Sequence, residues 1–481
     1  MKKLEIILLT LLLIGAFTVR LYRFSGPIAD WHSWRQADTS SVSRNFVKYG
    51  FDLLHPRIDN ISNVQTDGKY ENPKGYFFAE FPLYNTAQAG LYVLLGHFTL
   101  EEWGRLVTIF SSLFVMIFIY LLCKKYASKT SGYFAVFFYA FLPFVIYYSR
   151  TILPASSMLA TLLGSVYFFD LFLDVQSTGK KYLFFCISLF LITASILIMP
   201  YALFYALPFL YLLWKKFGFA FFLKWQIYAY LILAITPFVA WRLWMLQYPE
   251  GIPANDWLFN GGNIRFTGSF FYWLFAERMG RLILGYWGVA LLVIGIIAKK
   301  KHIGFFLSFF VSSLVYLTVI ARGNVQHDYY QLVIMPSVVI LLGLGSEFLF
   351  VSSKEVVNTY AGWVLLCVCC LFSIAFGWYS VRDFFNINNP NIVVAGKAVD
   401  RVTPKNAKIL TFYNGDSTLL YQTNRFGWAS LEKPLEDMIK MGADYIVIPN
   451  PTPNDLNGFG KDYKVVAVTP QYLIINLHHK Q

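Results

Sequence analysis

Long apolar runs alternate with short polar segments over most of the first 380 residues. The opening run, LEIILLTLLLIGAF, and those that follow it approach the ~20 residues that a helix needs to cross a bilayer. Eleven crossings are expected, at 4–24, 103–123, 131–149, 152–174, 182–199, 200–214, 226–246, 281–298, 303–320, 331–351 and 360–379. Residues 1–380 are therefore predicted to form an all-α polytopic membrane domain.

The polar segment 25–101 is expected to form the first outer loop. It contains one further apolar run, TAQAGLYVLLGHF at 86–98, which is short for a crossing. Counting this run as a crossing would also invert the side on which every later lysine cluster lies. We therefore predict that it is an interfacial or re-entrant helix, and that the amphipathic stretch 38–46 is a second interfacial helix.

Residues 381–481 have a different character, with alternating strand-like and helix-like segments. KILTFYN, ADYIVIPN, VVAVTP and QYLIINL are typical of strands, and LEKPLEDMIKMG is typical of a helix that ends at a glycine. This alternation predicts a small α/β domain. Because the last crossing runs outward, the domain is expected on the extracytoplasmic side.

The composition excludes a soluble protein. Hydrophobic residues make up 57% of the chain and charged residues 14%, against about a quarter in soluble domains. The net charge of +13 includes lysine clusters between the apolar runs, at 2–3, 124–125, 180–181, 215–216 and 299–301. This is the positive-inside pattern, so we expect a multi-pass cell-membrane protein with a cytoplasmic N-terminus and no nucleic-acid partner.

The five cysteines lie in or at the edge of apolar runs, at positions 123, 186, 367, 369 and 370. The CVCC stretch lacks His and carboxylate neighbours, so packing between membrane helices is the better explanation than a metal site. No disulfide framework is implied.

Polar residues of several types gather on the predicted outer side. In the first loop the stretch DWHSWRQAD places two carboxylates on either side of Arg35, which can hold one of them ionised while the other acts as a base. Arg150 ends a crossing, where it can snorkel to the interface or bind a phosphate. The candidate residues are Asp30, Asp38 and Glu80 for catalysis, and His32, Arg35, Gln36, Arg150, His327, Tyr329 and Tyr330 for substrate binding.

Carboxylates, arginines and histidine beside a membrane suit a lipid substrate whose phosphate head carries a leaving group outside the bilayer. An arginine would stabilise the departing phosphate, and a carboxylate would take the proton of an acceptor hydroxyl. This chemistry is group transfer from a lipid phosphate.

The order of SWRQAD, EFPLYN, WGRL, YYSRTILP and QHDYYQL over residues 1–380 resembles the GT-C superfamily of integral-membrane glycosyltransferases. Within it, the chain looks like the bacterial relatives of protein O-mannosyltransferases and of the lipid A aminoarabinose transferase. The resemblance implies a polyprenyl-phosphate sugar donor, inverting transfer and an active site that faces outward. The tail is similar to the extracytoplasmic extensions of such proteins.

The resemblance also implies roles for single residues. The family's essential acid lies in the first loop, often as an Asp-Glu pair, whereas this chain has DWH and QAD. The base is therefore Asp30 or Asp38, and we prefer Asp30 because it lies nearest the end of the first crossing. Glu80 matches the second acidic position, and Arg150 and His327 would bind phosphate or sugar.

The resemblance leaves the metal and the acceptor open. The family includes metal-dependent and metal-independent members; we expect no cofactor with a lipid monophosphate donor, and a divalent metal stays open. Besides membrane lipid and the donor, the expected partner is an acceptor hydroxyl on a glycan, a lipid or a protein.

Two other functions compete with this interpretation. A transporter or flippase of a lipid-linked glycan usually needs polar groups at the middle of the bilayer and often has inverted repeats. The apolar runs carry almost no charge at their centres, and no repeat is visible. A non-catalytic scaffold that displays the tail would leave the polar first loop unexplained.

Overall fold

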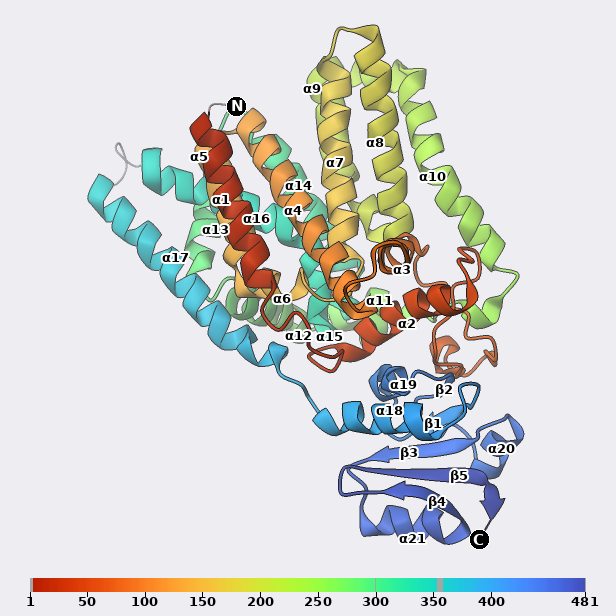
Figure 1. The fold of residues 1–481 in the computed structure, drawn as a ribbon. Helices are drawn as coiled ribbons and strands as arrows, with labels where there is room; N and C mark the ends of the chain where they lie inside the picture. Colours follow the sequence, from red (N-terminus) through yellow and green to blue (C-terminus); the bar gives the residue numbers. More distant parts are fainter. Residues whose placement is uncertain (1–2, 299, 353–357, 481) are drawn as a thin grey trace. The chain divides into compact units, whose positions relative to one another are not determined.

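The computed structural model describes residues 3–298, 300–352 and 358–480 (Figure 1). Lys2 and Lys299 of the predicted lysine clusters lie outside these ranges. The chain divides into two compact units, and the division falls within two helices, α4 (Leu100–Tyr126) and α10 (Trp225–Met245).

Unit 1 holds the apolar helices: it contains the chain up to Phe24, Arg105–Trp241 and Asn255–Asp383. Its helices are α1 (Lys3–Arg20), most of α4 and α10, α5 (Lys129–Phe141), α6 (Pro143–Tyr148), α7 (Ala155–Asp174), α8 (Thr178–Ile198), α9 (Ala206–Phe217), α11 (Asp256–Asn260), α12 (Gly268–Phe271), α13 (Gly288–Ile297), α14 (Ile303–Val319), α15 (Ala321–Gln326), α16 (Met335–Glu347) and α17 (Thr359–Val381). Segments of 3-10 or π-helix extend several of them: η2 (Pro200–Tyr205), η3 (Gly218–Leu223), η6 (Tyr272–Ile283), η7 (Asp328–Ile334), η8 (Phe348–Ser352) and η10 (Arg382–Phe385). The last of these ends two residues beyond unit 1.

Helices occur at each of the eleven predicted crossings. Among the described residues, seven helical segments are long and apolar enough to cross a membrane, or eight if one bent pair counts as a single span. Some of the others are shorter: α14 has 17 residues, and the run 131–149 is broken where Pro143 begins α6. The predicted break at Met199-Pro200 is present between α8 and η2. The prediction of a polytopic helical membrane protein is confirmed.

The centre of unit 1 is α16, which is buried along its whole length. Glycines let its neighbours come close: a Cβ on Gly295 of α13 would lie 1.9 Å from the carbonyl oxygen of Leu341, and one on Gly345 would lie 2.0 Å from that of Leu291. Small residues at such contacts are the usual means by which membrane helices pack.

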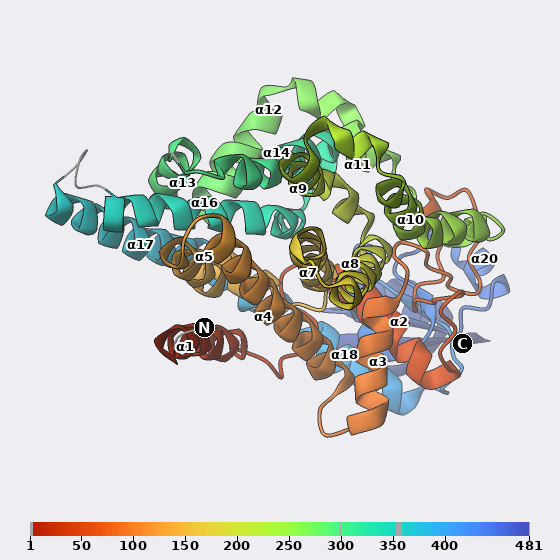
Figure 2. The same cartoon turned by 90° about the horizontal axis from the view of Figure 1, so that it is seen from above.

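Unit 2 consists of Ser25–Gly104, Arg242–Ala254 and Phe384–Gln481. The first loop and the tail therefore share one compact unit, whereas the sequence suggested a division at residue 380 with the loop in the membrane domain. The loop helices are α2 (Ser33–Tyr49) and α3 (Leu83–Leu95), which lie side by side, with a 3-10 turn η1 (Val64–Thr66) between them in sequence (Figure 2). A further turn, η4 (Pro249–Gly251), follows α10.

The two loop helices differ in burial. Helix α2 is longer than the predicted 38–46 and is buried over most of its length, so its many polar side chains contact protein. Helix α3 has 13 residues and ends in an exposed apolar tip, Val93, Leu94 and Leu95, as an interfacial helix would.

The tail forms a five-stranded mixed sheet in the order β2-β1-β3-β5-β4. The elements are α18 (Pro390–Val402), β1 (Ile409–Thr411), α19 (Ser417–Thr423), β2 (Gly427–Trp428), α20 (Leu435–Lys440), β3 (Tyr445–Pro449), α21 (Pro453–Asp462), β4 (Tyr463–Val468) and β5 (Tyr472–Lys480). Strands β2, β1 and β3 are parallel, and β5 is antiparallel to both β3 and β4. The predicted α/β domain is therefore present.

Helices cover both faces of this sheet (Figure 1). Apolar residues of α18 and α19 pack on the face that carries Ile409, Val447 and Ile474. Residues of α20 and α21 pack on the face that carries Leu410, Ile446 and Ile475. Neighbouring residues of a strand point to opposite faces, which explains why both sets are apolar.

Candidate active site

Asp30 lies just before α2 and is 4% exposed. The side-chain amide nitrogen Nε2 of Gln36, one turn into the helix, donates to Asp30 Oδ1 at 2.7 Å. On the main chain, Asn388 Nδ2 donates to the Asp30 carbonyl oxygen at 3.0 Å. The side chain and the backbone of this acid are thus both held by unit 2.

His32 joins Asp30 to α2 and has a left-handed backbone, with φ of 53°. Such a conformation is strained for a residue other than glycine and persists where the surrounding structure holds it. The ring of the adjacent Trp31 lies 4.9 Å from that of His32 and stacks on Phe384 at 5.0 Å. Unit 2 therefore holds the turn before α2 firmly.

Arg35 and Glu80, both predicted site residues, form an ion pair. Arg35 also donates to the Thr39 hydroxyl at 3.2 Å, within the same helix. The pair joins α2 to the start of α3, and Glu80 keeps 20% of its side chain exposed. The structure thus brings together Asp30 with Gln36, and Arg35 with Glu80.

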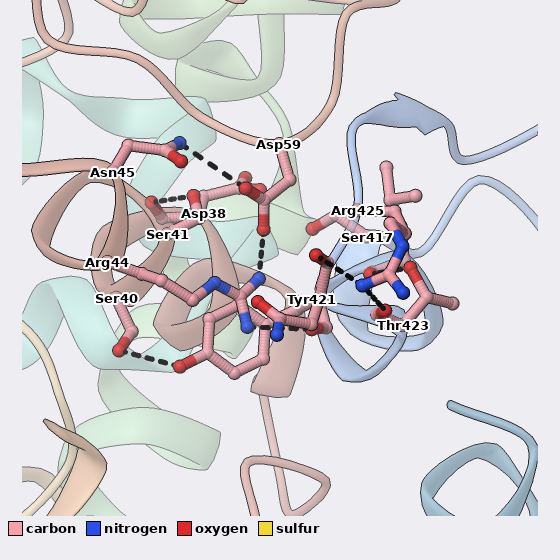
Figure 3. A network of polar contacts seen from close by, with 12 residues as sticks. Asp38, Ser40, Ser41, Arg44, Asn45, Asp59, Ser417, Tyr421, Thr423 and Arg425 are labelled. Carbon is pink, nitrogen blue, oxygen red and sulfur yellow. Dashed lines mark hydrogen bonds and ion pairs between the residues drawn. The ribbon is translucent and has the colours of Figure 1, made fainter. Parts of the chain in front are cut away.

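Asp38 is 4% exposed and lies beside the start of α19 (Figure 3). Burial raises the pKa of its carboxyl to about 6, although a hydrogen bond with Ser417 and the charge of Arg35 oppose the rise. A carboxylate with a pKa close to the working pH is suited to general base catalysis. The geometry therefore keeps Asp38 as the alternative to Asp30.

Replacing Asp38 with Asn is expected to stabilise unit 2 at high pH. The pKa of Asp38 in the folded protein exceeds that of an exposed Asp, so the ionised carboxylate lowers the free energy of unfolding. This loss of stability is absent below about pH 4, grows between about pH 4 and 6, and is complete above about pH 6. At pH 8 the variant should be more stable by up to about 3 kcal/mol, less the contribution of the Ser417 bond. At pH 4 wild type and Asp38→Asn should have the same unfolding temperature.

The measurement is thermal unfolding of both proteins in detergent between pH 4 and 8. Asp437→Asn is the matched control, because Asp437 lies in the same unit with 49% of its side chain exposed and pairs with Lys440. A gap between wild type and the Asp38 variant that does not change with pH would contradict the expected linkage.

The other predicted residues lie in unit 1. Arg150 is 2% exposed, in the turn after α6. It donates to the carbonyl oxygen of Arg23 at 3.1 Å, and its guanidinium lies 5.5 Å from the ring centre of Tyr147. A buried guanidinium at the end of a membrane helix is suited to holding a phosphate.

His327, Tyr329 and Tyr330 form a stack between α15 and η7. The His327 ring lies 5.5 Å from that of Tyr329, and the two tyrosine rings are 4.6 Å apart. Trp257 approaches the histidine by its edge at 5.8 Å. Aromatic faces of this kind can pack against the apolar faces of a sugar ring.

Sequence reasoning did not select Asp328 and Arg278 as site residues. Asp328 is 1% exposed, accepts a hydrogen bond from the Tyr148 hydroxyl and lies 3.7 Å from the guanidinium of Arg278. Tyr148 is the neighbour in sequence of Tyr147, whose ring contacts the Arg150 guanidinium. The segments of Arg150 and His327 thus meet within unit 1.

Residues of α19 are a second set that sequence reasoning missed. Ser417 lies beside Asp38, and Asp416 caps α19 by accepting from the Thr418 amide at 2.7 Å. Only the N-cap pattern of DSTLL signals this helix in the sequence.

Within the described residues, no group of three or more His, Cys, Asp or Glu side chains is arranged to hold a metal ion. The steps proposed below are assigned to side chains of the protein.

Comparisons with known proteins address the family. Residues 82–244 match the model of the dolichyl-phosphate-mannose-protein mannosyltransferase family. No curated protein sequence matches the chain.

The fold is shared with several solved structures, among them ArnT and AglB. ArnT from Cupriavidus metallidurans, bound to undecaprenyl phosphate, superposes with a TM-score of 0.66 at 13% identity, covering 98% of this chain and 97% of that one. The archaeal oligosaccharyltransferase AglB from Archaeoglobus fulgidus, in complex with an inhibitory peptide and a dolichol-phosphate, gives a TM-score of 0.59 at 11% identity, covering 100% of this chain and 76% of that one. The chain therefore shares the fold of ArnT and AglB, and residues 82–244 match the mannosyltransferase family model, in agreement with the resemblance seen in its motifs.

Proposed function

We propose that the protein transfers a sugar from a polyprenyl-phosphate donor to an acceptor hydroxyl on the outer face of the membrane, with inversion. The observation that carries this proposal is the buried Asp30 carboxylate, held by Gln36 on the loop that follows the first membrane helix. Support comes from ArnT, which has the same fold and was solved with undecaprenyl phosphate.

In the proposed reaction Asp30 takes the proton of the acceptor hydroxyl. The acceptor oxygen attacks the anomeric carbon from the side opposite the phosphate, and the bond from that carbon to the phosphate oxygen breaks. The electron pair leaves with the polyprenyl phosphate, and the sugar inverts its configuration. The products are the glycosylated acceptor, the free lipid phosphate and a proton on Asp30.

The remaining residues would serve binding and orientation. We assign the lipid phosphate to Arg150, because a guanidinium binds phosphate oxygens in bidentate fashion and stabilises the charge that develops on them. Gln36 would orient Asp30, and the Arg35–Glu80 pair would fix the start of α3 beside α2. The aromatic residues His327, Tyr329 and Tyr330 would contact the sugar.

The donor assignment is tested by lipid binding. Full-length protein in nanodiscs should bind undecaprenyl phosphate, measured by native mass spectrometry. Arg150→Ala should weaken binding roughly 10- to 100-fold, the size of effect expected when one charged hydrogen-bond partner is lost. Arg281→Ala is the matched control, because Arg281 lies in the same unit and is 39% exposed, in an ion pair with Glu277.

The reaction itself is tested with undecaprenyl-phosphate sugars. Release of undecaprenyl phosphate together with a glycosylated acceptor is the expected result, followed by mass spectrometry in membranes that contain the native acceptors. Movement of labelled donor across vesicles without covalent transfer would overturn the proposal in favour of a flippase.

A further inference from the structure

The first loop extends the sheet of the tail. Asn60 forms a parallel bridge with Gly427 of the edge strand β2. The Gly427 amide donates to the Asp59 carbonyl oxygen at 3.0 Å, and the Ile61 amide donates to the Gly427 carbonyl oxygen at 2.9 Å. Ile61 is buried in the same apolar cluster as Trp428. A loop segment thus completes an edge that would otherwise present unpaired backbone groups.

A second contact between loop and tail is centred on Tyr421 of α19 (Figure 3). Its hydroxyl lies 3.0 Å from the Ser40 hydroxyl of α2 and donates to the carboxylate of Glu101 in the first turn of α4. The guanidinium of Arg44 lies 3.8 Å from the centre of the Tyr421 ring and donates to the Tyr421 carbonyl oxygen at 2.9 Å. One residue of the tail therefore contacts both α2 and α4.

The same arginine connects the two contacts. Arg44 forms an ion pair with Asp59, whose backbone pairs with β2, and Asn45 donates to the Arg57 carbonyl oxygen at 2.9 Å and to Asp59 Oδ1 at 3.3 Å. Asp59 and Tyr421 are 4% exposed. A buried ion pair contributes little net stability, but loss of one member leaves a buried charge unpaired and is strongly destabilising.

Residues of α19 contact α2 from its first turn onward. The Thr418 hydroxyl donates to that of Ser33 at 3.0 Å, and the Ser417 hydroxyl donates to the Trp34 carbonyl oxygen at 3.3 Å. One turn further on, Tyr421 contacts Ser40 and Arg44. Gln36, which holds Asp30, lies on the same helix, one turn before Ser40. A shift of α2 would therefore move the partner of the proposed base.

We propose that Tyr421 is a positioning residue: through Ser40, Arg44 and Glu101, the α19 helix of the tail holds α2 and with it the Gln36–Asp30 pair. In this proposal the tail belongs to the catalytic unit and is not a separable module for display or recognition. Its consequence for sugar transfer rests on the function proposed above, whereas the mechanical coupling of α19 to α2 does not.

The coupling is tested by hydrogen–deuterium exchange on the full-length protein in nanodiscs. Tyr421→Phe removes the hydroxyl and keeps the ring under Arg44, so residues 33–49 should exchange at least about tenfold faster. Residues 303–319 of unit 1 and strand β3 of the tail should not change. Tyr445→Phe is the control, because its hydroxyl contacts Asn476 of the same sheet.

Unchanged exchange of α2 in Tyr421→Phe, or an equal acceleration of β3 and α2, would overturn the proposal. Glu101→Leu provides a second variant that removes the acceptor of the Tyr421 hydroxyl at a similar side-chain size: it should accelerate exchange of α2 by a similar factor. The double variant should match the stronger single variant, since both changes break the same bond. If the two acceleration factors multiply in the double variant, Tyr421 and Glu101 act independently, which would contradict the shared bond.

Kinetics distinguish positioning from general weakening of the fold. Tyr421→Phe should lower kcat at least about tenfold and leave the KM for the undecaprenyl-phosphate sugar unchanged. Unchanged kcat beside faster exchange would reject the catalytic consequence and keep the coupling. If wild type transfers no sugar but the exchange pattern appears, the proposed function fails and the coupling stands.

Discussion

Asp30→Asn should lower sugar transfer by roughly 10²-fold or more, because removing a positioned general base typically costs 10²–10⁴ in rate. The substitution keeps the size of the side chain and leaves an oxygen that can accept from Gln36. Binding of undecaprenyl phosphate should be unchanged, so the loss should appear in kcat. The measurement is the rate of sugar transfer beside lipid binding by native mass spectrometry.

Asp52→Asn is the matched control for this prediction. Asp52 lies in the same loop with 57% of its side chain exposed and pairs with His55, so its substitution should leave transfer unchanged. Near-normal transfer by Asp30→Asn with loss in Asp38→Asn would assign the base to Asp38. In that case the transfer rate of wild type should rise with pH through about 6. Full activity in Asp30→Asn, Asp38→Asn and Glu80→Gln alike would reject an acid from this loop as base.

Gly427→Ala should unfold unit 2 locally, with a loss of about 3 kcal/mol or more. A Cβ at this position would lie 1.8 Å from the carbonyl oxygen of Ile409, which is backbone in the adjacent strand and cannot rotate away. Separating β2 from β1 would also disturb the bridge from Gly427 to Asn60. We expect faster hydrogen–deuterium exchange in β1, β2 and residues 57–61, and lower thermal stability.

The control for this prediction is Gly458→Ala in α21 of the same domain. A Cβ at Gly458 meets nothing within 4 Å, and alanine favours helix, so this variant should be as stable as wild type or slightly more stable. Normal exchange of residues 57–61 in Gly427→Ala would contradict the role of β2 as the strand that holds the first loop.

Local patterns were sufficient for much of the architecture. Hydropathy runs predicted helices at the right places, since burial in lipid demands long apolar segments whatever their neighbours are. The short run at 86–98 corresponds to α3, whose 13 residues are fewer than a crossing needs. In the tail, alternating apolar residues identified β1, β3, β4 and β5. The sequence analysis missed β2, whose two residues are too few to show a period, and the helices α18, α19 and α21.

The candidate site was less accessible to sequence reasoning. The stretch 30–38 stood out because six of its nine residues are polar and it follows a membrane helix, but its partners lie far along the chain. Glu80 pairs with Arg35 across 45 positions, and Tyr421 meets Ser40 across 381. No local period reports such pairs, because they depend on how separate helices pack.

The sequence by itself determined that this protein is a multi-pass membrane protein with a polar first loop, an α/β tail and an ordered set of motifs that resembles the GT-C superfamily. These properties depend on local hydropathy and on short motifs. Only the tertiary structure decided that the first loop and the tail form one unit, that Asp38 faces α19 while Asp30 is held by Gln36, and that Asp328 is buried beside Tyr148. The physical reason is that a buried charge needs a partner, which can come from any part of the chain that the fold brings near. The residues next to either partner in the sequence do not reveal the pair.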